Sequence, residues 1–149
     1  MSFLQILLRF VHIVSAVTAG GAAIFAAIAL LPALTTLPDA ERLRLKEAID
    51  RRWRIVVMSA ITLLLVSGLA GFVLYQAPAH KGQPLYHALF GVKFLAALIV
   101  FFLASALTGR SAALAAIRAK ARLYAGIAAT LVVVIVLISA VLRNIPRST

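Results

Sequence analysis

Residues 124–142 read YAGIAATLVVVIVLISAVL, a stretch from Tyr124 to Leu142 that contains no charged side chain. A helix needs about 20 apolar residues to cross the hydrocarbon core of a bilayer. The stretch therefore predicts a membrane-spanning helix. Arg143 and Pro146 follow it within four positions and predict its end.

Three more stretches have a similar character, and they run from Phe3 to Leu34, from Ile55 to Tyr75 and from Tyr86 to Leu107. The first is longer than a bilayer requires, so we expect it to tilt or protrude, with Pro32 tolerated near its inner end. Its apolar run is too long for a signal peptide and contains Arg9, which predicts a retained span.

Four spans and their links occupy the whole chain of 149 residues, so we expect a single domain over residues 1–149. Hydrophobic residues make up 64% of the sequence and the mean hydropathy is +1.08. Because every link is short, successive helices are expected to pack as an antiparallel four-helix bundle. The predicted fold class is an all-α integral membrane protein.

The link before the second span is hydrophilic and predicts a short surface helix that runs directly into that span. Asp39 is a plausible N-cap, and Glu41 in the first turn favours the helix dipole. Acid-first pairs four residues apart predict two ion pairs, Glu47 with Arg51 and Asp50 with Arg54.

The other two links differ in composition. Residues from Gln76 to Pro84 contain two prolines and a glycine and predict a loop. The link from Gly109 to Arg122 is short, basic and rich in alanine.

The positive charge is distributed unevenly along the chain. The formal net charge is +11, and all four acidic residues lie between positions 39 and 50. The first and third links hold ten basic residues, namely Arg42, Arg44, Lys46, Arg51, Arg52, Arg54, Arg110, Arg118, Lys120 and Arg122. This pattern predicts contact with anionic lipid head groups rather than nucleic acid, and it predicts that both termini lie outside the cytoplasm.

His12 is the first residue in a predicted span that could carry chemistry. It lies about 13 Å along the first span, where an ionisable side chain is expected to face the bundle interior. A neutral imidazole at this position could ligate a metal or a haem. Alternatively, its ring nitrogens could only hydrogen-bond a neighbouring helix.

Lys93 lies at a similar depth in the third span, and no Asp or Glu lies within any predicted span to neutralise it. It could pair with a carboxylate of a bound cofactor or act as a base, or its long stem could reach the interface. We expect His12 and Lys93 to face a shared cavity lined by Ser15, Thr18 or Tyr86.

Two other residues near the outer ends of the spans are weaker candidates. Arg9 lies one turn before His12 and either reaches the head groups or binds a cofactor. His87 is either an interfacial residue or a second metal ligand. His80 is expected to be an ordinary loop residue. Cysteine is absent, which excludes disulfides and thiolate ligands.

The chain resembles a family of four-helix bacterial membrane proteins, the protoporphyrinogen IX oxidases, and more distantly copper resistance protein D. The likeness begins at His12 with Thr18-Ala19-Gly20-Gly21 and extends through Arg51-Arg52-Trp53-Arg54-Ile55-Val56-Val57-Met58 and Val92-Lys93-Phe94-Leu95-Ala96-Ala97-Leu98. It covers nearly the full length of the chain.

The resemblance implies a b-type haem, an oxidoreductase activity and a location in the bacterial inner membrane. It implies functional roles for His12 and Lys93, with Lys93 as a catalytic residue. The chain departs from the family at Ala19, where the family usually has tryptophan, and it lacks a further histidine late in the third helix. The resemblance therefore extends to fold and haem binding more than to oxidase activity.

Three functions follow from these observations. The first is a haem-binding, redox-linked membrane protein, which could act as a homo-oligomer or with a membrane redox partner. The second is a copper uptake or resistance protein that uses His12 and His87. The third is a non-catalytic accessory subunit whose polar residues only set helix packing.

Overall fold

A computed structural model describes residues 2–147, which contain helices and turns but no strand. The helical segments in chain order are α1 (Phe3–Phe25), η1 (Ala26–Leu30), α2 (Leu31–Leu34), α3 (Asp39–Gly71), η2 (Phe72–Gln76), α4 (Ala77–Ala79), α5 (Pro84–Thr108), η3 (Ala112–Leu114), α6 (Ala115–Ala119) and α7 (Ala121–Asn144).

Contiguous segments join into four helices that are long and apolar enough to cross a membrane: Phe3–Leu34, Asp39–Ala79, Pro84–Thr108 and Ala121–Asn144. The predictions of an all-helical chain and of four candidate spans are confirmed.

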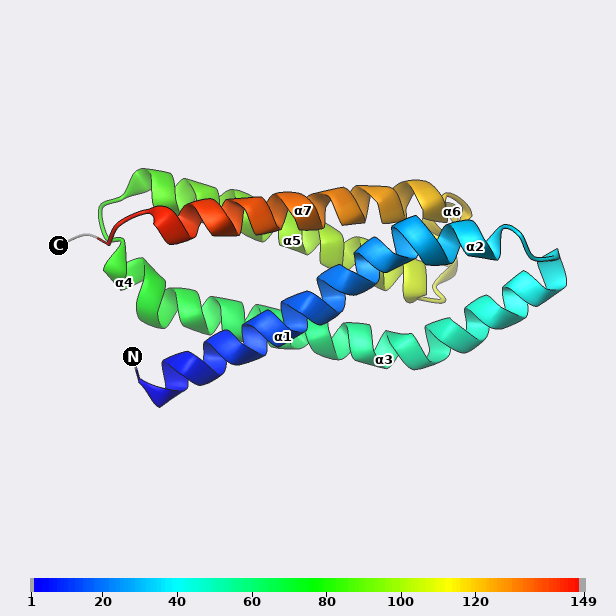
Figure 1. Ribbon diagram of the computed structural model, residues 1–149, viewed down its shortest axis with the longest axis horizontal. Helices are drawn as coiled ribbons and strands as arrows, with labels where there is room; N and C mark the ends of the chain where they lie inside the picture. The colour runs from blue at the N-terminus through cyan, green and yellow to red at the C-terminus, as the bar shows by residue number, and fades with distance from the viewer. Residues whose placement is uncertain (1, 148–149) are drawn as a thin grey trace.

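The chain runs back and forth along the long axis of the molecule, and the start of α1 and the end of α7 lie at the same end (Figure 1). Helix α1 crosses the molecule diagonally and contacts both α3 and α7. Helix α5 packs along α7 and also contacts α3. Each long helix therefore has two long neighbours.

Five of the twelve buried hydrophobic residues in the described part of the chain are alanines, and many large apolar side chains face outward. The most buried residues include Ala60, Ala106 and Ala125, and Ala106 is 0% exposed. By contrast, Phe10 and Val136 are both 63% exposed. Small residues let helix backbones approach closely, and an outward apolar surface suits contact with lipid tails rather than water.

Two π-helical segments each end two residues before a proline. Ala26–Leu30 precedes Pro32, and Phe72–Gln76 precedes Pro78. A proline ring clashes with the carbonyl four residues earlier and supplies no N–H to it. Here the residue after each segment donates to the segment's first carbonyl, which widens the turn. Both helices therefore continue through their prolines.

This continuation corrects the loop predicted from Gln76 to Pro84. Helix persists to Ala79, so only residues 80–83 separate the second candidate span from α5. The hydrophilic segment after Pro38 likewise forms no separate surface helix. It is the first half of α3, which continues without a break into the apolar half, as expected for a segment running directly into the span.

The start of α3 also differs in detail from the prediction. Pro38 occupies the N-cap position, and Asp39 is the first helical residue rather than the cap. Asp39 and Glu41 do lie in the first turn, where their charges favour the helix dipole.

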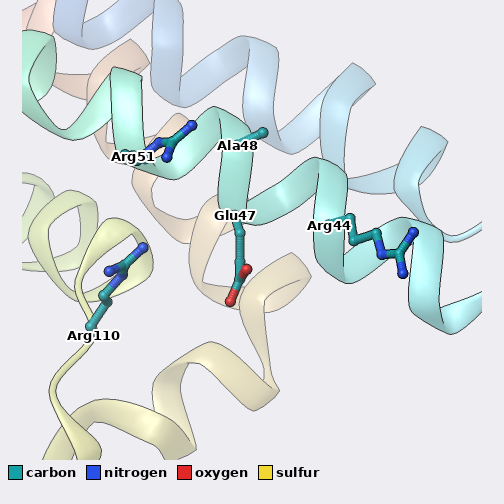
Figure 2. A pocket seen from close by; sticks show the side chains of 5 residues that line it. All are labelled: Arg44, Glu47, Ala48, Arg51 and Arg110. Atoms are coloured by element: carbon teal, nitrogen blue, oxygen red, sulfur yellow. The ribbon is translucent and has the colours of Figure 1, made fainter.

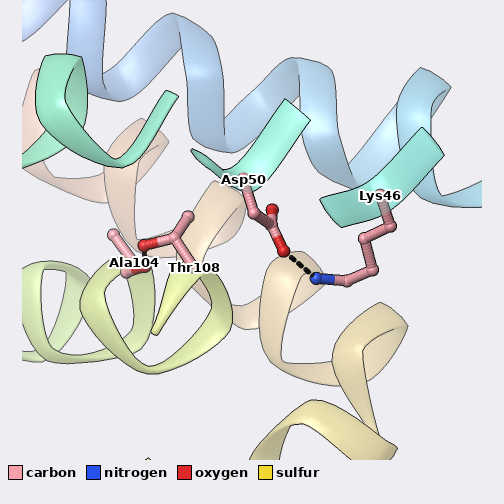
Figure 3. A network of polar contacts seen from close by, with 4 residues as sticks. All are labelled: Lys46, Asp50, Ala104 and Thr108. Atoms are coloured by element: carbon pink, nitrogen blue, oxygen red, sulfur yellow. Dashed lines mark hydrogen bonds and ion pairs between the residues drawn. The ribbon is translucent and has the colours of Figure 1, made fainter. Parts of the chain in front are cut away.

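The predicted ion pairs Glu47–Arg51 and Asp50–Arg54 are wrong. In residues 2–147 the ion pairs join Arg42 to Asp39 at 2.5 Å and Lys46 to Asp50. Figure 3 shows the Lys46–Asp50 pair close to the end of α5, where the Thr108 hydroxyl donates to the Ala104 carbonyl. Asp50 pairs with the lysine one turn before it, so its carboxylate is already engaged away from Arg54.

Candidate functional site

His12 packs directly against the backbone of α3. The Nδ1 atom of its ring lies 3.1 Å from the Oγ of Ser67. The ring also covers Gly68, where an added Cβ would lie 3.0 Å from the Cε1 of His12. Glycine at this position therefore allows the imidazole to approach α3 closely enough to reach Ser67.

The hydroxyl of Ser67 has a second partner that determines its role. Its Oγ donates to the Leu63 carbonyl at 2.5 Å, one turn earlier in α3. A hydroxyl has one proton, so an Oγ that donates to Leu63 can only accept from His12. The Nδ1 of His12 must then carry the hydrogen. This assignment leaves a lone pair on Nε2, the nitrogen that could bind a metal or take a proton.

Lys93 lies at the same level as His12 in the third span. His12 is nine positions after the start of α1 at Phe3, and Lys93 is nine positions after the start of α5 at Pro84. Both positions correspond to about 13 Å along the helix. Lys93 is half-buried. The two residues therefore lie at a similar depth in the first and third candidate spans.

Lys93 has no ion-pair partner among residues 2–147. All four acidic residues of the chain lie between positions 39 and 50, and neither ion pair found in residues 2–147 involves Lys93. A half-buried ammonium without a protein anion is a suitable partner for an anionic group of a ligand.

The residues expected to line a cavity between His12 and Lys93 are differently engaged. Ser15 is buried, and the Thr18 hydroxyl donates to the Val14 carbonyl at 2.9 Å. Tyr86 lies near the start of α5, where its ring stacks on His80 at a centroid distance of 3.7 Å. Arg9 is exposed on α1, which agrees with the prediction that it could reach head groups.

Two hollows in the described part of the chain lie elsewhere. One is formed by Arg44, Glu47, Ala48, Arg51 and Arg110 (Figure 2). The other lies along α7 and is formed by Arg122, Leu123, Gly126, Ile127, Thr130 and Leu131.

His87 belongs to a separate polar cluster near the turn between α4 and α5. Its Nε2 lies 3.1 Å from the His80 carbonyl oxygen and so donates to it. That nitrogen is therefore engaged and does not offer a lone pair. In residues 2–147 no group of three or more His, Cys, Asp or Glu residues could hold a metal ion.

His80 was expected to be an ordinary loop residue, but it is only 3% exposed. Its Nδ1 bonds the Oε1 of Gln83 at 2.8 Å, and the Nε2 of Gln83 donates to the Pro146 carbonyl at 3.0 Å. These bonds fasten the turn to the segment after α7. In the sequence, the nearby Tyr86 was the one signal that His80 could be buried, because an aromatic ring can cover a neighbouring imidazole.

The fold defines a class, that of all-helical proteins with four candidate membrane spans. Comparisons with known protein families, with curated proteins and with solved structures found no match.

Proposed function

We propose that this chain is a haem-binding, redox-linked integral membrane protein of the kind its sequence resembles, the protoporphyrinogen IX oxidases. The observation that carries the proposal is the hydrogen bond from His12 to Ser67. Histidines that ligate a metal almost always donate their other ring N–H to a fixed acceptor, which orients the ring and keeps the ligating nitrogen free. His12 has this arrangement.

The residues present are chemically suited to a b-type haem. The Nε2 of His12 would bind the haem iron, and the ammonium of Lys93 would pair with a haem propionate. When bound, a haem supplies a centre that accepts and returns one electron at a time. The Nε2 of His87 donates to the His80 carbonyl, so only its Nδ1 would keep a lone pair for a metal.

Lys93 and Arg9 would have distinct roles in haem binding. Lys93 would bind the acidic groups of a porphyrin and would donate a proton to it or accept one from it. Arg9, exposed one turn from His12, would help only if a propionate extended toward the head groups.

The proposed topology is an antiparallel four-helix bundle in the bacterial inner membrane with both termini outside the cytoplasm. Helices α1 and α5 begin at the same end of the molecule (Figure 1), and the two links at the opposite end carry ten of the fifteen Lys and Arg residues. Links rich in Lys and Arg remain in the cytoplasm. The haem would then lie in the outer half of the bilayer.

Purified protein titrated with haem tests the proposal. We expect a Soret band that shifts and sharpens on binding, is abolished by His12→Ala and is retained in His87→Ala. Copper retained without a Soret band would favour the copper uptake or resistance function instead. Binding of neither would leave an accessory subunit. A haem spectrum unchanged by His12→Ala would eliminate His12 as the ligand.

A further inference from the structure

A basic pocket lies at the end of the bundle opposite to the start of α1. Arg44, Glu47, Ala48 and Arg51 of α3 form one side, and Arg110 of the link after α5 forms the other, around a hollow of about 210 Å³. The α3 residues follow the spacing i, i+3, i+4, i+7, so they share one face of the helix. Figure 2 shows Arg110 extending from the link toward α3 and Glu47 pointing from α3 toward the link.

The arginines of this pocket are not neutralised within the described part of the chain. Between residues 2 and 147 the ion pairs join Arg42 to Asp39 and Lys46 to Asp50, and none of these four residues lines the pocket. The lining thus contains three arginines and one glutamate. The lining therefore has a formal excess of two positive charges.

The backbone around Arg110 is fixed by its neighbours. At Gly109 an added Cβ would lie 2.7 Å from the Ser105 carbonyl oxygen. Glycine is therefore needed where the chain leaves the end of α5 and passes close to this carbonyl. On the other side of Arg110, the Nη2 of Arg118 donates to the Ser111 carbonyl at 2.6 Å. A fixed backbone reduces the entropy lost when Arg110 binds a ligand.

The pocket lies at the level expected for lipid head groups. Arg110 is two residues beyond Thr108, where α5 ends, and Arg51 is four residues before the apolar run that begins at Ile55. Four helical residues span about 6 Å. Head groups add roughly 5–7 Å to each side of the hydrocarbon core. Arg51 and Arg110 therefore flank the layer that contains lipid phosphates.

We propose that this pocket binds the phosphate of an anionic phospholipid head group, of the phosphatidylglycerol type. The planar guanidinium groups of Arg51 and Arg110 present paired N–H donors that match two phosphate oxygens. Ala48 leaves room for the head group, and Arg44 adds positive charge from the cytoplasmic side. Glu47 repels the phosphate and so limits the affinity. The site is independent of any cofactor at His12.

Native mass spectrometry of protein purified in neutral detergent tests the site. The probes are short-chain phosphatidylglycerol, short-chain phosphatidylcholine and inorganic phosphate. We expect phosphatidylglycerol to bind most tightly, and Arg51→Gln/Arg110→Gln to weaken its binding by about thirtyfold. The matched control, Arg52→Gln/Lys120→Gln, removes two positive charges from the same side of the protein outside the pocket. We expect that control to change binding by less than about threefold.

A third variant tests the sign of the charge effect. Glu47→Gln removes the like charge and should strengthen phosphatidylglycerol binding by about fivefold. Equal losses in the two double variants would show a diffuse basic surface and overturn the proposal. Binding of inorganic phosphate or phosphatidylcholine as tightly as phosphatidylglycerol would also overturn it. Weaker binding in Glu47→Gln would mean that the carboxylate holds a cationic head group, which contradicts an anionic ligand.

Discussion

The Nδ1 of His12 and the Oγ of Ser67 lie 3.1 Å apart, although the two residues are separated by 55 positions in the sequence. Ser67 in turn donates to the Leu63 carbonyl, so the serine hydroxyl is an acceptor for the imidazole. The bond does two things at once. It compensates for the burial of a polar ring between helices, and it directs the lone pair of the ring away from α3.

Replacing Ser67 with alanine tests this arrangement directly. In Ser67→Ala the Nδ1–H of His12 loses its acceptor, so the ring should populate both tautomers. Haem affinity should then fall by roughly 10- to 100-fold. The tautomers are distinguished by ¹⁵N chemical shifts of labelled histidine, and haem affinity is measured by absorbance titration.

Ser139→Ala is a matched control for this variant. Ser139 on α7 also donates to a carbonyl one turn earlier, that of Ile135 at 2.6 Å. The Ser139→Ala variant should leave the His12 tautomer and the haem affinity unchanged. An unaltered His12 tautomer in Ser67→Ala would refute the role of Ser67, and this outcome does not depend on whether haem binds.

A methyl group at Gly68 should displace His12. The Cβ of Gly68→Ala would lie 3.0 Å from the Cε1 of His12, so the ring must shift by a few tenths of an ångström. We expect haem affinity to fall by roughly tenfold. Gly71→Ala, on the same helix, has nothing within 4 Å of the new Cβ and should bind haem normally. Equal haem affinity in the two variants would contradict close packing of His12 on Gly68.

Lys93 should lower the free energy of unfolding and raise the affinity for haem. Lys93→Met removes a half-buried charge that has no ion-pair partner within residues 2–147, so unfolding in detergent should become harder by about 1–2 kcal/mol. Affinity for haem should fall, because a propionate loses its cation. Lys81→Met, in the turn after α4, is the control and should alter neither property. A destabilised Lys93→Met protein would mean that Lys93 makes favourable contacts in the fold.

The orientation in the membrane can be measured with reporters fused after residue 149. An alkaline phosphatase folds only outside the cytoplasm, and we expect it to be active when fused at this position. The reason is that the ten basic residues of the first and third links keep those links in the cytoplasm. A fluorescent protein that matures only in the cytoplasm should remain dark at the same position. The opposite result for both reporters would reverse the proposed topology.

Hydropathy alone was enough to predict four long apolar helices, because the cost of placing polar groups in a bilayer is a local property of each stretch. The same reasoning selected His12 and Lys93, since ionisable residues in an apolar run are conspicuous. The sequence predicted a similar depth for the two residues, and α1 and α5 begin within two residues of the predicted span boundaries.

Tertiary structure decided the partners of those residues. Nothing in the sequence identifies Gly68 and Ser67 as partners of His12, because their contact with the ring depends on how α1 and α3 rotate against each other. It also missed the burial of His80, which requires Tyr86 and Gln83 to meet it after the chain has turned. Hydropathy follows from each segment by itself, whereas a hydrogen bond or a stacked ring requires two segments at a fixed distance and angle.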